Sequence, residues 1–121
     1  MSGYVLGAVH QVFCKNTTAA KSILEASKQI WSSYLEALKA NGLTDAATLK
    51  QVEVETVGFT VAEVCRTALE FAGGRKWLQF DDKATKAAAN KAALGIVDQC
   101  MIGRHEGGIQ LMWDAMASAI Q

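Results

Sequence analysis

Proline is absent from this sequence of 121 residues, so no residue lacks the backbone N–H that a helix interior requires. A surplus of charge is absent as well, because 12 basic residues balance 12 acidic ones. Proteins that bind nucleic acids need a basic surface to neutralise phosphates, so we expect no nucleic-acid partner. Alanine is abundant and the strand formers do not alternate with polar residues, which together predict an all-α fold.

Cysteine and histidine are too few and too scattered to predict a metal or catalytic site. The three cysteines form no Cys-x-x-Cys pair, and we interpret them as reduced thiols at apolar positions. His10 and His105 lie far apart, and only Cys100 is near His105 in the sequence. A zinc site needs three or four converging ligands. The glycines at 73–74 lack the pattern of a phosphate-binding loop. We therefore expect no cofactor, no metal ion and no enzymatic activity.

Hydrophobic periodicity, polar caps and glycine breaks predict about four to five helices. The expected helices cover residues 4–13, 17–40, 45–72, 83–103 and 109–120. The polar residues at 16–18, then Thr44 or Asp45, then 81–82 are the candidate caps, and Gly42 suits a left-handed helix end. We expect an extended rather than compact arrangement, with a helical region at 1–80 followed by a helical extension at 81–121.

The third expected helix carries charges on one face of a mostly apolar segment. Glu63, Arg66 and Glu70 are spaced so that they share that face, where Arg66 can pair with either carboxylate. One interpretation is a solvated stripe on a soluble helix. The other is a membrane-associated helix of low hydrophobicity over 56–72, about 25 Å long against a hydrocarbon core of about 30 Å.

The membrane interpretation assigns roles to the residues around this segment. Charged side chains at depth are costly against lipid, so they would face neighbouring protein, and such a helix would need partner subunits. Arg75 and Lys76 would lie at the level of the lipid headgroups, and Trp77 and Phe80 would be interfacial anchors.

A short motif adds a family resemblance to this interpretation. Residues 70–80 read Glu-Phe-Ala-Gly-Gly-Arg-Lys-Trp-Leu-Gln-Phe, and this stretch resembles the g subunit of mitochondrial ATP synthase. The family has a glutamate, a glycine, a basic cluster and a closing aromatic residue at positions that here hold Glu70, Gly73, Arg75, Lys76 and Phe80. Upstream, Trp31 and Tyr34 on an amphipathic helix also look like the family. The resemblance covers roughly residues 20–80.

The resemblance implies a structural accessory subunit of the ATP synthase membrane sector, at the mitochondrial inner membrane. Such a subunit supports dimerisation of the enzyme and curvature of the membrane. Its partners would be other membrane subunits, among them one like subunit e. Glu70 would meet a polar partner or a lipid headgroup, and Arg75 and Lys76 would attract an anionic lipid such as cardiolipin.

The alternative is a soluble α-helical protein-interaction module. In that case the apolar stripes of the helices close one core, and Glu63, Arg66 and Glu70 face water. A third interpretation, a small helical enzyme, would need a cofactor pocket that these residues do not supply.

Overall fold

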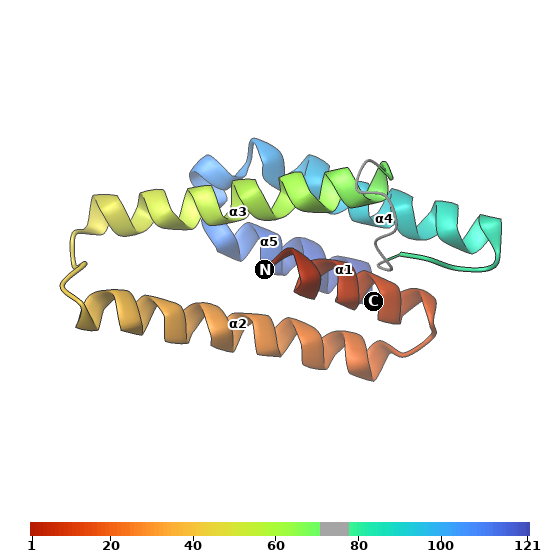
Figure 1. Ribbon diagram of the computed structural model, residues 1–121, viewed down its shortest axis with the longest axis horizontal. Helices are drawn as coiled ribbons and strands as arrows, with labels where there is room; N and C mark the ends of the chain where they lie inside the picture. Colours follow the sequence, from red (N-terminus) through yellow and green to blue (C-terminus); the bar gives the residue numbers. More distant parts are fainter. Residues whose placement is uncertain (71–77) are drawn as a thin grey trace.

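The computed structural model describes residues 1–70 and 78–121, and every regular element in these two segments is an α-helix (Figure 1). The described part of the chain has five helices and no β-strand, which confirms the all-α prediction. Their bounds are α1 Ser2–Phe13, α2 Thr17–Ala40, α3 Ala46–Ala68, α4 Lys83–Met101 and α5 Arg104–Ile120.

Side-chain caps start three of the helices where the sequence predicted them. The side chains of Asn16, Asp45 and Asp82 accept hydrogen bonds from backbone N–H groups in the first turns of α2, α3 and α4, at 3.1, 2.9 and 2.9 Å. Each cap satisfies a donor that has no partner inside the helix, and this local bond defines the helix start.

The end of α2 also follows its sequence signal. Gly42 adopts the left-handed region, with φ of 93°. Its N–H donates to the carbonyl of Lys39, and the N–H of Leu43 donates to the carbonyl of Leu38. This pair of bonds is the Schellman motif, which satisfies carbonyls at a helix end and turns the chain. The chain then reverses, so that α2 and α3 run antiparallel along the long axis (Figure 1).

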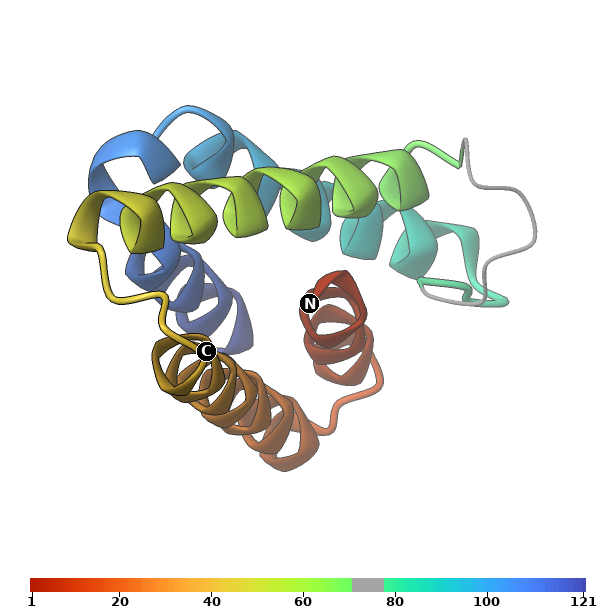
Figure 2. The same ribbon diagram turned by 60° about the vertical axis from the view of Figure 1, so that its left-hand side comes forward.

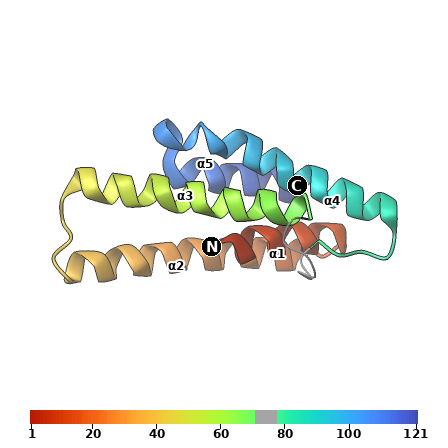
Figure 3. The ribbon, with the colours of Figure 1, turned by 45° about the horizontal axis from the view of Figure 1, so that its top comes forward.

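The helices form three layers. Helices α3 and α4 make one outer layer, α1 and α5 lie in the middle, and α2 makes the other outer layer (Figure 2). Among the described residues α2 contacts only α1 and α5, whereas α3 contacts α1, α4 and α5. Figure 3 gives the same arrangement from another side. Helix α2 is therefore packed on one side only, whereas α3 has neighbours in its own layer and in the middle layer.

One hydrophobic core joins all five helices. The buried alanines Ala89 and Ala93 of α4 are fully covered, and such small side chains allow α4 to approach α3 closely. The core side chains include Val5 and Leu6 of α1, Leu24 and Trp31 of α2, Val57, Val61 and Val64 of α3, Ile96 and Cys100 of α4, and Met112 and Met116 of α5. We expected an extended arrangement, but segments 1–70 and 78–121 pack into this common core because α4 and α5 supply much of its apolar surface.

Helix α3 ends earlier than expected. The pattern predicted a helix through residue 72, but α3 ends at Ala68 and Glu70 has a left-handed backbone, with φ of 64°. A left-handed residue directly after the cap is a common helix terminator. Here the side chain of Glu70 also forms an ion pair with Lys86 of α4, which holds the turn against the next helix. In the part of the chain described here, no helix combines the length and hydropathy needed to cross a bilayer.

A kink divides α5 where the sequence predicted a break. Gly108 has φ of 60° and ψ of −151°, outside the helical region, although helical residues lie on both sides. A Cβ at this position would lie 1.9 Å from Oε2 of Glu53 on α3. The backbone angles favour glycine strongly, and any side chain here would also have to displace the carboxylate of Glu53.

Candidate functional site

The charged residues predicted on the third helix lie on the surface of α3 and at its end. Nε of Arg66 lies 3.8 Å from Oε1 of Glu63, and their side chains are 50% and 38% exposed. Glu70 instead turns toward α4 and pairs with Lys86. Glu63 and Arg66 thus share a face as predicted, while Glu70 is directed to a different helix.

The motif after α3 is only partly covered by the structure. Gly73, Arg75, Lys76 and Trp77 lie outside the described residues. Phe80 is half-buried, and its ring stacks on that of His10 with centroids 4.9 Å apart. The ring of Phe13 meets it edge-on at 6.3 Å. The structure therefore places Phe80 against α1.

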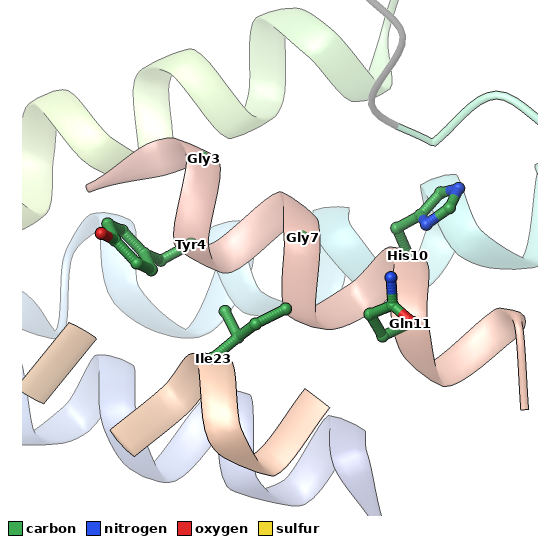
Figure 4. Close-up of a pocket in the computed structure, with 6 residues that line it drawn as sticks. All are labelled: Gly3, Tyr4, Gly7, His10, Gln11 and Ile23. Atoms are coloured by element: carbon green, nitrogen blue, oxygen red, sulfur yellow. The ribbon is translucent and has the colours of Figure 1, made fainter. Parts of the chain in front are cut away.

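A pocket between α1 and α2 was not found from the sequence (Figure 4). Its volume is about 360 Å³, and Ile23 of α2 closes the side opposite α1. The residues on α1 that line it are Gly3, Tyr4, Gly7, His10 and Gln11. Gly3 and Gly7 share one face of α1, and this glycine pair was the available sequence signal. The pocket suits a small apolar group, because hydrocarbon and ring atoms dominate these side chains.

A continuous stripe runs along the outer side of α3. Its residues follow one another at alternating spacings of three and four, and we call this set the outer stripe. It consists of Val52, which also packs against the core, then Glu55, Phe59, Ala62 and Arg66, and Leu69, which caps the end of α3. Phe59 is 75% exposed and Leu69 is 48% exposed. This spacing is the one that helices use to pack side by side.

A hollow lies beside the middle of the outer stripe. It has a volume of about 270 Å³ and is lined by Glu55, Gly58, Phe59, Ala62 and Arg104. Gly58 has no side chain to fill the hollow. A Cβ added at Gly58 would lie only 2.9 Å from Nε of Arg104. Nearby in the chain, Ile102 at the α4–α5 junction is 81% exposed. This part of the surface is therefore apolar and indented, with one charge of each sign.

A second exposed apolar pair lies on α2. Ile30 and Tyr34 are 44% and 46% exposed and are one helical turn apart. The ring of Trp31, which is itself buried, lies 5.7 Å from that of Tyr34. Tyr34 thus rests on a fixed aromatic side chain.

The cysteines and the metal-ligand candidates can be placed among the described residues. Residues 1–70 and 78–121 contain no group of three His, Cys, Asp or Glu side chains arranged to hold a metal ion. Sγ of Cys14 lies 3.6 Å from Nδ1 of His10 at an exposed position, so the expectation that every cysteine fills an apolar position was wrong for Cys14. Cys100 is fully buried, and burial raises the pKa of its thiol, which makes it a poor nucleophile.

Comparison with known proteins identifies no relative. No protein family, curated protein or solved structure matches this chain.

Proposed function

We propose that this chain is a non-catalytic helical module that binds other proteins through apolar side chains on its outer faces. The observation that carries the proposal is the exposure of large apolar side chains on a bundle that has already closed its core. They are Phe59 on α3, Leu69 at its end, Ile102 at the α4–α5 junction, and Ile30 and Tyr34 on α2. Aromatic residues, Tyr among them, are frequent among the few side chains that carry most of the binding energy of an interface, and apolar neighbours exclude water around them.

The α2 pair offers the simplest test of this proposal. The Ile30→Ser/Tyr34→Ser variant removes exposed apolar surface and keeps the buried Trp31, although Trp31 loses its ring contact with Tyr34, so circular dichroism must show that the variant is folded. We expect proteins captured by the tagged wild type to be recovered about tenfold less with this variant. The Glu36→Gln variant changes an exposed residue of the same helix and should capture them as the wild type does. Equal recovery with all three chains, measured by quantitative mass spectrometry, would overturn a role for this pair.

A more specific candidate is a structural accessory subunit of mitochondrial ATP synthase. The resemblance of residues 70–80 to the g subunit favours it, as do Trp31 and Tyr34 on α2. In this candidate the chain lies at the mitochondrial inner membrane beside other membrane subunits, one of them like subunit e, and supports dimerisation and curvature. Residues 56–72 would be the membrane-associated part. Because Val57, Val61 and Val64 pack inside the bundle, the outer stripe would be the side of α3 that meets lipid or a partner.

The test of this candidate is a tagged pull-down from gently solubilised source membranes, resolved on a native gel. Co-migration with an ATP synthase dimer is the expected result. Recovery without any large complex would overturn the assignment and leave the general proposal standing.

Lipid binding has a separate test. The Arg75→Gln/Lys76→Gln variant should float less with vesicles that contain cardiolipin than the wild type, because it lacks two charges that attract lipid phosphates. Equal flotation of both chains would contradict a lipid role for these two residues.

A further inference from the structure

The outer stripe of α3 has the spacing of a helix-packing seam. Its alternation of three and four residues places each member on one line along the helix, as in coiled coils. The opposite face of α3 is already buried, with Val57, Val61 and Val64 fully covered. A helix with one buried apolar face and a second seam outside, made of apolar residues and two charged ones, can receive another helix on the seam.

The hollow on this seam has the form of a receptor site for one side chain. Glu55, Gly58, Phe59 and Ala62 are spaced at i, i+3, i+4 and i+7, the four positions that surround an inserted side chain in coiled-coil packing. Gly58 contributes no side chain to the hollow, the side chain of Arg104 lies over Gly58 and forms one wall, and the hollow has a volume of about 270 Å³. The shape thus points to a helical partner.

The residues of the outer stripe are complementary to the same residues read in the opposite direction. Paired antiparallel about a point between Thr60 and Val61, two copies place Glu55 opposite Arg66 of the second copy. The same axis places Phe59 opposite the small Ala62, and the half-buried Val52 opposite Leu69. Charge meets opposite charge and a large side chain meets a small one, as a two-fold interface requires.

The parallel alternative lacks this complementarity. It would place Glu55 against Glu55, Arg66 against Arg66 and Phe59 against Phe59 of the second copy. Like charges directly opposite each other oppose association. For two copies of this chain, the charges therefore favour the antiparallel direction over the parallel one.

We propose that a second copy of this chain packs antiparallel on the outer stripe of α3, with Glu55 and Arg66 forming reciprocal ion pairs at the two ends of a Phe59–Ala62 centre. The inference rests on the proposed role in protein binding and names one partner for one surface. It leaves the Ile30–Tyr34 pair on α2 for other proteins.

A charge-reversal cycle on the full chain tests the pairing. The dissociation constant of the dimer is measured by sedimentation over a concentration series. Glu55→Arg and Arg66→Glu should each weaken the dimer by about tenfold or more, because each brings like charges together. The double variant Glu55→Arg/Arg66→Glu should restore it to near the wild-type value. Glu36→Arg, on the exposed side of α2, is the matched control and should leave the dimer unchanged.

Disulfide trapping tests the direction. In a Cys14→Ser/Cys65→Ser background, the Glu55→Cys and Arg66→Cys variants should form a crosslink when mixed and not when alone, since only antiparallel copies bring these positions together. Circular dichroism checks that every variant is folded.

Two outcomes would overturn the inference. One is a wild type that stays monomeric throughout the series, and the other is a dimer that the single reversals leave intact. A monomer that still loses captured proteins in the Ile30→Ser/Tyr34→Ser variant would refute the self-association and keep the proposed function. A dimer that captures nothing else would support the self-association and count against a role for the α2 pair.

Discussion

Helices α2 and α3 are almost equal in length, with 24 and 23 residues, yet they are held in different ways. Helix α2 fully buries one narrow stripe of Ala20, Leu24, Ser27 and Trp31, and its last turns contribute only partly buried side chains such as Leu35. Helix α3 is buried along most of its length and also carries the outer stripe, in which the apolar residues are joined by Glu55 and Arg66. The difference shows that α2 is an ordinary amphipathic helix, whereas α3 has two apolar faces, of which this chain covers one.

The comparison also explains the membrane interpretation. A helix with apolar residues on two faces resembles a uniformly apolar segment when it is examined along the sequence alone. In the structure the apolar residues of 56–68 separate into an inner face against α4 and α5 and an outer face with Phe59 and Ala62.

The largest expected effect is a difference in the free energy of unfolding between substitutions on the inner and outer faces of α3. Val61→Asp places a carboxylate at a fully buried position and should destabilise the fold by more than about 4 kcal/mol. Phe59→Asp, two residues away on the exposed face, should change the free energy of unfolding of the monomer by less than about 1 kcal/mol. Urea unfolding followed by circular dichroism compares them. Similar losses for both would mean that α3 does not have one inner and one outer face.

The next effect is a loss of stability when one of the few buried side chains of α2 is removed. Trp31→Ala should lower the free energy of unfolding by about 3 kcal/mol, because Trp31 is the largest of the buried side chains of this helix. Tyr34→Ala, at a neighbouring exposed position, should cost less than about 1 kcal/mol. Thermal melts of both variants provide the measurement, and a Trp31→Ala variant as stable as the wild type would show that α2 is anchored elsewhere.

A smaller effect is expected where α5 meets the start of α3. Gly108→Ala should cost about 2 kcal/mol, because alanine is strained at this backbone conformation and its Cβ would displace Glu53. Gly95→Ala in α4, where a Cβ meets nothing within 4 Å, should instead raise stability by up to about 1 kcal/mol. If denaturant unfolding shows that both variants change the free energy of unfolding in the same direction, the fold does not depend on the kink at Gly108.

The smallest expected effect is a pH dependence of the free energy of unfolding, which comes from the capping aspartates of α3 and α4. Hydrogen bonds from the hydroxyl and the N–H of Thr48 lower the pKa of Asp45 below its usual 3.8, and Thr85 does the same for Asp82. A lowered folded-state pKa stabilises the fold above pH 3.8, and this contribution disappears as the pH falls through the lowered value.

Substitution isolates this contribution. From about pH 5 to about pH 2 the wild type should lose more stability than Asp45→Asn/Asp82→Asn, because asparagine still caps a helix but does not titrate. Parallel urea titrations at several pH values measure the difference. Curves that stay parallel down to pH 2 would show that the two caps do not contribute through their charge.

Local signals predicted much of the fold and little of the candidate surfaces. The caps at Asn16, Asp45 and Asp82 and the left-handed Gly42 act through bonds to residues within one turn. The stacking of Phe80 on His10 joins residues far apart in the chain, and no periodicity encodes it. The outer stripe was present in the sequence, but it became recognisable only once the inner face of α3 was known.

The sequence by itself determined the helical class, three helix starts and the breaks at Gly42 and Gly108, because these depend on backbone chemistry over a few neighbouring residues. Tertiary structure alone decided which face of α3 is buried, why Glu70 turns to Lys86 and which apolar side chains stay outside. Those outcomes depend on where α4 and α5 pack, and burial in a shared core is a property of the whole chain.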